Sequence, residues 1–527
     1  MKRSRVAGDQ DGRGASPIRR ARLAVESLET RALLSTAHPS HLKAAPAKAN
    51  PFPPYAITLQ LGPASDPGGT GYVFENRVLV QGFAVPNSTI WLATQPTGYF
   101  TKVARAINTG LYGFLVPVGK GTTEIRAFAE SPSQNYSLTS SVTATSSNPI
   151  IAWDALALRA IRNLNLADAE ASRDLAILHA AQYDAVMAIQ SPSLAFQVHA
   201  SAPRGASAEA AATAAADTVL EALMPSQSEA FQAALKSAKV GLPSNASTRD
   251  GLAVGREVAQ ATLAKRAADG SGVVAYNVPS NQPGLWRPTL PAFSPATDPQ
   301  WGKVAPFVIA SPSAFRPAAP PAVGSPAYDQ ALAEVASLGR LTSTSRTQDQ
   351  ANAAGFWSDG AFSLTAVGHW NQIAEGIAAG RRGSLAKDAR LFAQLDLALA
   401  DASIATADAK YTYDTWRPIS AIETTDPTWV PLVATPSSPG YVSEHAAIGS
   451  AASAVLSAEF GPRAKFTDQL YASAGVTRTY ASFADAAAEQ AIAGVWGGIQ
   501  TSHDVQAGAS LGDQVGKYVT GHFPAAK

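Results

Sequence analysis

Four residues in the C-terminal part of the chain have types and spacing that suit an oxyanion. Lys410 and Arg417 come first, and Ser443 and His445 follow after a stretch broken by prolines. Lysine supplies a point charge and arginine a planar fork of donors, which together suit a tetrahedral anion such as phosphate. The run of small residues after Ser443 favours a helix, so the serine is expected at an N-cap. Unpaired backbone N–H groups at such a helix start would add to the anion site.

The elements that must position these residues are helices. Small and apolar residues recur at three- and four-residue steps along 391–409, which predicts a long helix that ends near Lys410. Arg417 precedes Pro418, where the chain must leave helical geometry or begin a new helix. A similar pattern along 175–189 and the many alanines after Asn148 predict a helical bundle. A proline-rich crossing from Pro279 to about Pro326 is expected to have little regular structure.

Residues 55–147 have a different pattern, typical of short strands. Runs rich in β-formers occupy 78–85, 89–93, 113–118 and 124–129, with turn chemistry at Pro86 and Asn87. Such spacing predicts a β-sandwich. The stretch resembles a bacterial immunoglobulin-like module, and because it contains no catalytic cluster, a spacer or adhesion role is expected for it.

Composition limits the classes of partner. Residues 1–50 hold ten Lys/Arg and four Asp/Glu, a net charge of +6, so the remainder of this +1 chain carries −5 and does not attract nucleic acid. The chain has no cysteine, which excludes disulfides and thiolate metal sites. It has no apolar run long enough for a transmembrane segment.

The basic segment 1–54 is predicted to be a disordered export or targeting segment followed by a linker. Its stretch 25–35 resembles the N-termini of large exported bacterial surface proteins. This resemblance implies an exported protein of the cell envelope or the extracellular space.

Three motifs together carry a more specific resemblance. Lys410 with Arg417 and Pro418, then Ser443-Glu444-His445, then the run 493–500 resemble the anion-site motifs of vanadium-dependent haloperoxidases and type-2 phosphatidic acid phosphatases. The third motif is degenerate. It has Gly494 where the family has an arginine and Gln500 where the family has the histidine that binds vanadium.

The resemblance extends over about 150–525 and favours the haloperoxidase branch. Further matching segments are 179–186, 283–289, 301–307, 315–317, 356–357 and 368–371. The fold class implied is mainly α, with a haloperoxidase-like helical domain over 148–527 preceded by the immunoglobulin-like sandwich. His179 and His369 match family positions outside the anion motifs, and a structural role is expected for both.

The family pattern implies a role for each site residue. Lys410 and Arg417 would hold the anion's oxygens, Ser443 and the backbone N–H of Glu444 would bind it, and His445 would act as the acid–base group. Glu444 replaces a glycine, and its carboxylate is expected to point outward as a partner of the helix dipole. Neutral Gln500 can hydrogen-bond an anion, but its amide is a poor nucleophile and metal ligand.

His503 and Asp504, which follow Gln500 in the sequence, complete the set of candidate site residues. On a continuing helix His503 would share a face with Gln500, which makes it a candidate substitute metal ligand. Asp504 is read as an orienting group.

The resemblance leaves function open between two classes. One is a vanadium-dependent haloperoxidase, with vanadate as cofactor and peroxide and halide as small-molecule substrates, in which Gly494 and Gln500 weaken or abolish activity. The other is a non-catalytic exported surface or binding protein. Phosphate-ester hydrolysis of the acid-phosphatase type is a further alternative, although it needs a histidine where Gln500 stands. Family members often pair into dimers, so a homodimer is also an expectation from the resemblance.

Overall fold

The computed structural model describes residues 41–43, 57–62, 65–66, 71–73, 77–94, 99–118, 121–381, 383–469 and 476–524. Its contacts divide the chain into two compact units. One comprises Met1–Asp66 and Glu75–Ser146, and the other Pro67–Phe74 and Ser147–Lys527. The segment predicted for export, 1–54, lies outside the described residues except for strand β1 (His41–Lys43).

The first unit is built from antiparallel strands. One sheet has the order β2-β4-β7, and another runs β1-β6-β5-β8-β9. The bounds are β2 (Gln60–Leu61), β4 (Arg77–Phe83), β5 (Thr89–Ala93), β6 (Tyr99–Arg105), β7 (Leu111–Pro117), β8 (Gly121–Glu130) and β9 (Ser140–Ser146). The four strands predicted from sequence are confirmed as β4, β5, β7 and β8. Val78 and Val80 of β4 and Ile125 of β8 are fully buried, as expected for strands that pack against a core.

The second unit is mainly helical. A two-stranded ribbon, β10 (Phe466–Gln469) with β11 (Thr477–Tyr480), and the short strand β3 (Tyr72–Val73) accompany the helices. The helices are α2 (Pro149–Leu164), α3 (Asp168–Gln190), α4 (Ala208–Leu223), α5 (Ser228–Gly241), α6 (Ala246–Arg266), α7 (Pro326–Leu338), α8 (Gln348–Phe356), α9 (Thr365–Arg381), α10 (Leu385–Tyr413), α11 (Pro418–Ile422), α12 (Glu444–Phe460), α13 (Phe483–Trp496) and α14 (Ser502–His522). No helix among the described residues is long and apolar enough to cross a bilayer.

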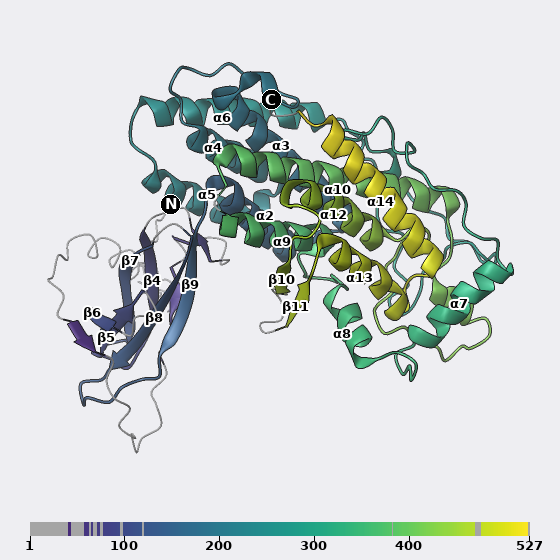
Figure 1. The fold of residues 1–527 in the computed structure, drawn as a ribbon, viewed down its shortest axis with the longest axis horizontal. Coiled ribbons are helices and arrows are strands. Elements are labelled where there is room, and N and C mark those ends of the chain that lie inside the picture. The colour runs from purple at the N-terminus through teal and green to yellow at the C-terminus, as the bar shows by residue number, and fades with distance from the viewer. Residues whose placement is uncertain are drawn as a thin grey trace, which may run out of the picture. The chain divides into compact units, whose positions relative to one another are not determined.

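The long helix α10 lies at the centre of this unit. It packs against α3, α12 and α14, and Figure 1 shows α10, α12 and α14 side by side. Its predicted small and apolar positions are all buried: Leu391, Leu395, Ala398, Ala402, Ala405 and Ala409. The Ser384 hydroxyl caps the start of the helix, and Asp414 ends it in left-handed geometry at φ 48°. The periodicity of this segment therefore predicted its helix and its buried face correctly.

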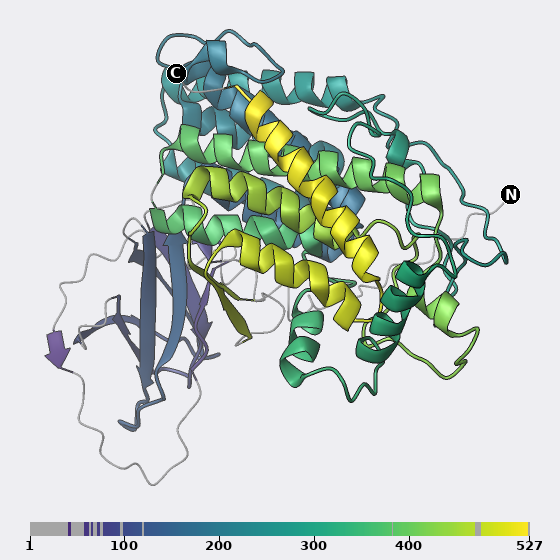
Figure 2. The same ribbon diagram turned by 45° about the vertical axis from the view of Figure 1, so that its right-hand side comes forward.

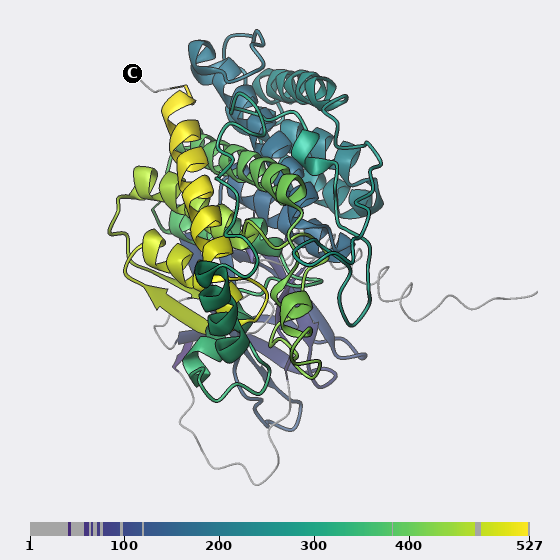
Figure 3. The same cartoon turned by 90° about the vertical axis from the view of Figure 1, so that its right-hand side faces the viewer.

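A stripe of glycines brings α14 against α12. A Cβ added at Gly508 would lie 2.2 Å from the Ser443 carbonyl oxygen, and one at Gly512 would lie 1.9 Å from that of Ala447. Only glycine allows two helix backbones to approach this closely. The helix α14, drawn in yellow, remains on the outside of the bundle in Figures 2 and 3. The contact sets the start of α12 directly beside the first turns of α14.

The proline-rich crossing is irregular, as expected, with only the short 3₁₀ turn Trp301–Lys303 between α6 and α7. Buried Asp401 of α10 holds it in place. Its carboxylate accepts from the backbone N–H groups of Phe307, Val308 and Ile309 at 2.6–2.9 Å. These bonds satisfy backbone donors that have no secondary-structure partner.

Candidate functional site

The predicted site residues converge where several helices begin or end. Lys410 lies in the last turn of α10, and Arg417 is the residue before α11. Ser443 is the N-cap of α12, as predicted, and its hydroxyl accepts from Ala446 N at 3.4 Å. Gln500 lies in the turn between α13 and α14. Three segments distant in sequence, around 410–417, 443 and 500, therefore place these side chains together.

Lys410 is almost completely buried, with 2% of its surface exposed. Its Nζ donates to the carbonyl oxygen of Pro439 at 2.8 Å. Burial and the neighbouring charge of Arg417 lower the pKa of Lys410 to about 7. A negatively charged group beside Lys410 would raise this pKa and favour the charged form of the amine.

The guanidinium of Arg417 is also buried, and protein acceptors surround it. Nε donates to the Ser438 carbonyl oxygen at 2.7 Å, and Nη2 donates to the Ser438 hydroxyl at 2.9 Å. Nη1 donates to the Ile499 carbonyl oxygen at 3.0 Å. Burial lowers the pKa of Arg417 to about 10. The fork that would hold an oxyanion is directed at the protein's own oxygens.

Gln500 adds one more acceptor to this arginine. With the amide oriented to satisfy its surroundings, its oxygen accepts from Nη1 of Arg417 at 2.7 Å. Its nitrogen then donates to Gly440 O at 2.9 Å and to Asp504 Oδ2 at 3.0 Å. Gln500 in this orientation bridges the guanidinium of Arg417 to the carboxyl group of Asp504.

Gly494 and Gln500 are in direct contact. The Gly494 carbonyl oxygen accepts from Ile499 N at 3.0 Å and from Gln500 N at 3.1 Å. A Cβ added at Gly494 would lie 3.0 Å from Cγ of Gln500. The glutamine side chain therefore covers the position where a longer side chain at 494 would begin.

A cavity of about 910 Å³ opens beside these residues. Its lining includes Lys410, Ser438, Glu444, His445 and Ile499. This volume lies in the range of small-molecule sites. We refer to it as the site cavity.

Glu444 faces the site cavity, which differs from the outward orientation expected for it. Burial and the nearby carboxylate of Asp168 raise its pKa, whereas Lys410 and His445 lower it. The N-terminal position on α12 favours a carboxylate as predicted, but the first turn of this helix faces the cavity rather than solvent. Glu444 therefore places negative charge close to Lys410 and Arg417.

His445 has a partner that the sequence did not indicate. Its Nε2 lies 3.9 Å from Oδ2 of Asp168, with 22% of the histidine side chain exposed in the site cavity. Asp168 begins α3, and its other oxygen accepts from Ala366 N at the start of α9. Burial and the charge of Asp359 raise the pKa of Asp168 to about 7. Since α3 and α12 are far apart in sequence, no local pattern could have paired them.

His503 is not brought to the site cavity. Its Nε2 lies 3.2 Å from the Ala327 carbonyl oxygen, and the residue lines a different cavity with Tyr328 and Trp416. The expected continuous helix does not exist here. Thr501 forms a capping box with Asp504, so α14 begins at Ser502, after Gln500.

His179 and His369, the two histidines for which structural roles are expected, are deeply buried in ion pairs. Nδ1 of His179 lies 2.5 Å from Asp396. His369 lies between two carboxylates, with Nδ1 3.0 Å from Asp359 and Nε2 2.9 Å from Asp468. Asp359 and Asp468 raise the pKa of His369 to about 10, against the effect of burial. Both positions are consistent with the structural roles expected.

The family model and the solved structures that match this chain agree on one family. The family model described as the second helical-bundle domain of VCPO matches residues 390–525. The crystal structure of the first bacterial vanadium-dependent iodoperoxidase superposes with a TM-score of 0.65 at 27% identity, covering 72% of this chain and 97% of that chain. These matches support the vanadium haloperoxidase-like superfamily for this chain. Holo-type bacterial vanadium-dependent chloroperoxidase shares the fold, with a TM-score of 0.54 at 17% identity over 68% of this chain and 94% of that one. No curated protein matches the sequence.

The site of this haloperoxidase-like protein does not fit the vanadium ligand set implied by the family motifs. The motif resemblance aligns Gln500 with the family histidine, and with its amide oriented to satisfy its surroundings both its oxygen and its nitrogen are already hydrogen-bonded. Within the described part of the chain, no group of three or more His, Asp or Glu side chains is arranged to hold a metal ion. Lys410, Arg417 and Ser443 supply the charge and hydroxyl for a tetrahedral anion. Gln500 stands where the motif resemblance would place the imidazole that coordinates the metal.

Proposed function

We propose that this protein is a haloperoxidase relative whose oxyanion pocket has lost turnover, and that it acts as an exported, non-catalytic binding or surface protein. One observation carries the proposal. With its amide oriented to satisfy its surroundings, Gln500 accepts from Arg417 and donates to Asp504, so the residue that the motif resemblance aligns with the metal-binding histidine links two of the protein's own charged groups.

The charge of the pocket supports the same conclusion. Arg417 contributes a positive charge and Lys410, with a pKa of about 7, contributes a partial one at neutral pH, and Glu444 and Asp504 lie close enough to act on both of them. An oxyanion therefore approaches cations that are already compensated. Each charge-assisted hydrogen bond that is missing costs about 1.5–3 kcal/mol, so vanadate is expected to bind this pocket weakly.

The chain also retains features that favour a second candidate, peroxide-dependent halide oxidation at a bound vanadate. Lys410, Arg417 and Ser443 keep their places, and His445 has Asp168 beside it in an open cavity. Such a pair suits proton transfer. Hydrolysis of a phosphate ester is less well supported, because Gln500 cannot act as a nucleophile.

The first unit is proposed as an immunoglobulin-like module. Its antiparallel strands and lack of a catalytic cluster are consistent with a spacer or adhesion role. The basic segment before it supports export to the envelope or extracellular space.

Titration of the purified full chain with vanadate and with phosphate tests the proposal. We expect no saturable vanadate binding by the unmodified protein, and binding with bromide oxidation in the Gly494→Arg/Gln500→His double variant. The matched control is Gly380→Arg, which adds the same charge to the exposed end of α9, where a Cβ meets nothing within 4 Å. Halide oxidation by the unmodified protein would contradict the non-catalytic assignment and favour the second candidate.

A further inference from the structure

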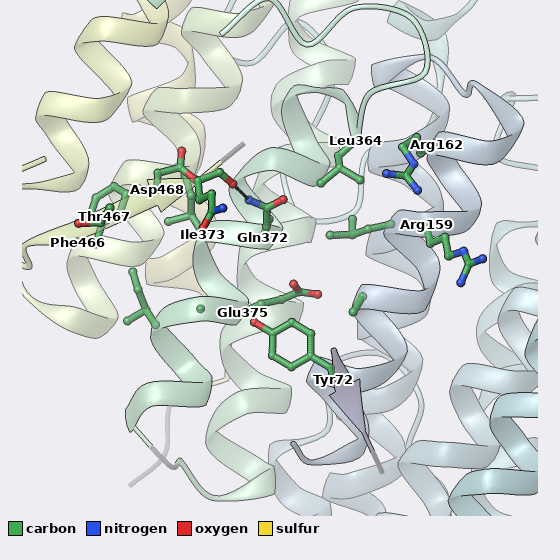
Figure 4. A pocket seen from close by; sticks show the side chains of 15 residues that line it. Tyr72, Arg159, Arg162, Leu364, Gln372, Ile373, Glu375, Phe466, Thr467 and Asp468 are labelled. Carbon is green, nitrogen blue, oxygen red and sulfur yellow. Dashed lines mark hydrogen bonds between the residues drawn. The ribbon is translucent and has the colours of Figure 1, made fainter. Parts of the chain in front are cut away.

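A second cavity, of about 580 Å³, lies between α2, α9 and strand β10, and Figure 4 shows the side chains that line it. Polar groups of this cavity are held by the protein itself. Nε2 of Gln372 donates to the Gln469 carbonyl oxygen at 2.7 Å, and Glu375 is hydrogen-bonded to Asp154. The most exposed apolar surface of the described chain lies elsewhere, in the segment 273–280 that follows α6.

Three side chains of this segment are the most exposed large apolar groups among the described residues. Tyr276 is 84% exposed, Val278 80% and Val274 77%. Ala275 and Asn277, which lie between them, are partly buried. Such alternation is typical of an extended chain, in which successive side chains point to opposite faces. Val274, Tyr276 and Val278 therefore form one outward row, which we call the exposed row.

The backbone that carries the exposed row is extended and has no strand beside it. The chain contains no turn or bend at 273–280. Among the described residues, no backbone N–H or carbonyl group of Val274–Val278 has a hydrogen-bond partner. Nδ2 of Asn277 donates to Oδ1 of Asp414 at 2.8 Å, which ties the segment to the end of α10. An extended backbone with a free edge is a template on which another strand can pair.

The exposed row suits a second copy of itself. The stretch 270–286 contains no charged residue, so two copies of it do not repel each other. Its apolar pattern also reads the same in both directions around Tyr276. In an antiparallel pair centred there, Tyr276 lies opposite Tyr276 of the second copy, and Val274 lies opposite Val278 of the second copy. Pro279 has no backbone N–H to donate and would end the ladder.

We propose that two copies of this chain associate through the exposed row, with their strands paired in antiparallel order about a twofold axis at Tyr276. A twofold contact uses the same surface on both copies and is closed. Pairing supplies partners for the free backbone groups, and aromatic and β-branched side chains stabilise each other across such strands. An unrelated partner would require no such symmetry of the pattern. This inference goes beyond the function proposed for the oxyanion pocket and does not depend on its activity.

Sedimentation equilibrium of the full-length protein measures this association. We expect a reversible dimer. Tyr276→Lys places two ammonium groups opposite each other at the axis and should raise the dimer dissociation constant by at least about tenfold. Val240→Lys is the matched control, because Val240 on α5 is 73% exposed and lies outside the row. A monomer at every concentration, or a dimer that Tyr276→Lys weakens no more than Val240→Lys does, would overturn the proposal.

Single cysteines test the register, because the chain has no cysteine of its own. Opposite residues of antiparallel strands have Cα atoms about 4.5–5.5 Å apart, which a disulfide can bridge, so Tyr276→Cys should cross-link the dimer under mild oxidation. Ala275→Cys should not cross-link, because its two introduced thiols belong to Cα atoms roughly 8 Å apart. The Val274→Cys/Val278→Cys double variant keeps Tyr276 and should also cross-link. Equal cross-linking at 275 and 276, or none at 276 and in the double variant, would refute the pairing.

Discussion

Gly508→Ala perturbs the contact that joins the candidate site to the fold. The added Cβ would lie 2.2 Å from the Ser443 carbonyl oxygen and 3.2 Å from Ser443 N. Ordinary contacts between carbon and a carbonyl oxygen are about 3.3–3.6 Å, so α14 and α12 must separate locally by about 1 Å. The same shift would lengthen the bond from Ser443 N to Asp504 O, which is 2.9 Å in the structure.

The free energy of unfolding of the helical unit should fall accordingly. Overpacking of this kind costs about 1–3 kcal/mol, and it offsets the gain of up to about 1 kcal/mol that alanine brings to a helix. Gly521→Ala on the same helix is the matched control, because a Cβ there meets nothing within 4 Å. It should gain stability or leave it unchanged.

Urea unfolding followed by circular dichroism measures both variants. We expect the midpoint of the helical unit to move to lower urea for Gly508→Ala and not for Gly521→Ala. Equal midpoints for the two variants would refute the argument that glycine is required for this close approach.

Three further predictions concern charged groups of the helical unit. His369→Gln removes the cation between Asp359 and Asp468 and should lower the free energy of unfolding by about 3–5 kcal/mol at neutral pH. Because the pKa of His369 is about 10 in the folded protein and lower in the unfolded chain, the stabilisation by His369 is fully present below the ordinary histidine pKa and is lost as pH rises toward 10. Urea midpoints of the unmodified protein and the variant, measured against pH, will show this loss. In the Gly494→Arg/Gln500→His double variant, Glu444→Gln removes negative charge beside Lys410 and should tighten vanadate binding by calorimetry about five- to tenfold, an expectation that unchanged affinity would contradict. In the Gly494→Arg/Gln500→His double variant, His503→Ala should leave vanadate binding unchanged, since its imidazole faces another cavity, and a loss of that binding would show that the histidine reaches the site.

Local patterns in the sequence predicted the elements that carry the site. The periodicity of 391–409 identified α10 and its buried face, and the small residues after Ser443 identified the N-cap of α12. Both features depend on neighbours within a few residues, so they can be read without a structure. The positions of Lys410, Arg417 and Ser443 relative to one another depended on the family resemblance.

Contacts between segments that are distant in sequence could not be predicted from local sequence patterns. Asp168 reaches His445 only because α3 and α12 pack in the same bundle. The inward orientation of Glu444 depends on which side of α12 faces the cavity, which its charge alone does not determine. His503 was misplaced because the capping box at Thr501 starts a new helix after Gln500.

The most direct test of the central claim is a vanadate titration of the unmodified protein beside the Gly494→Arg/Gln500→His double variant. Gln500 takes up a donor of Arg417, and Asp504 and Glu444 compensate the cations of the pocket. This arrangement predicts no saturable binding by the unmodified chain, and saturable binding with peroxide-dependent bromide oxidation in the double variant. Saturable binding and bromide oxidation by the unmodified chain, at levels that the double variant does not exceed, would contradict it.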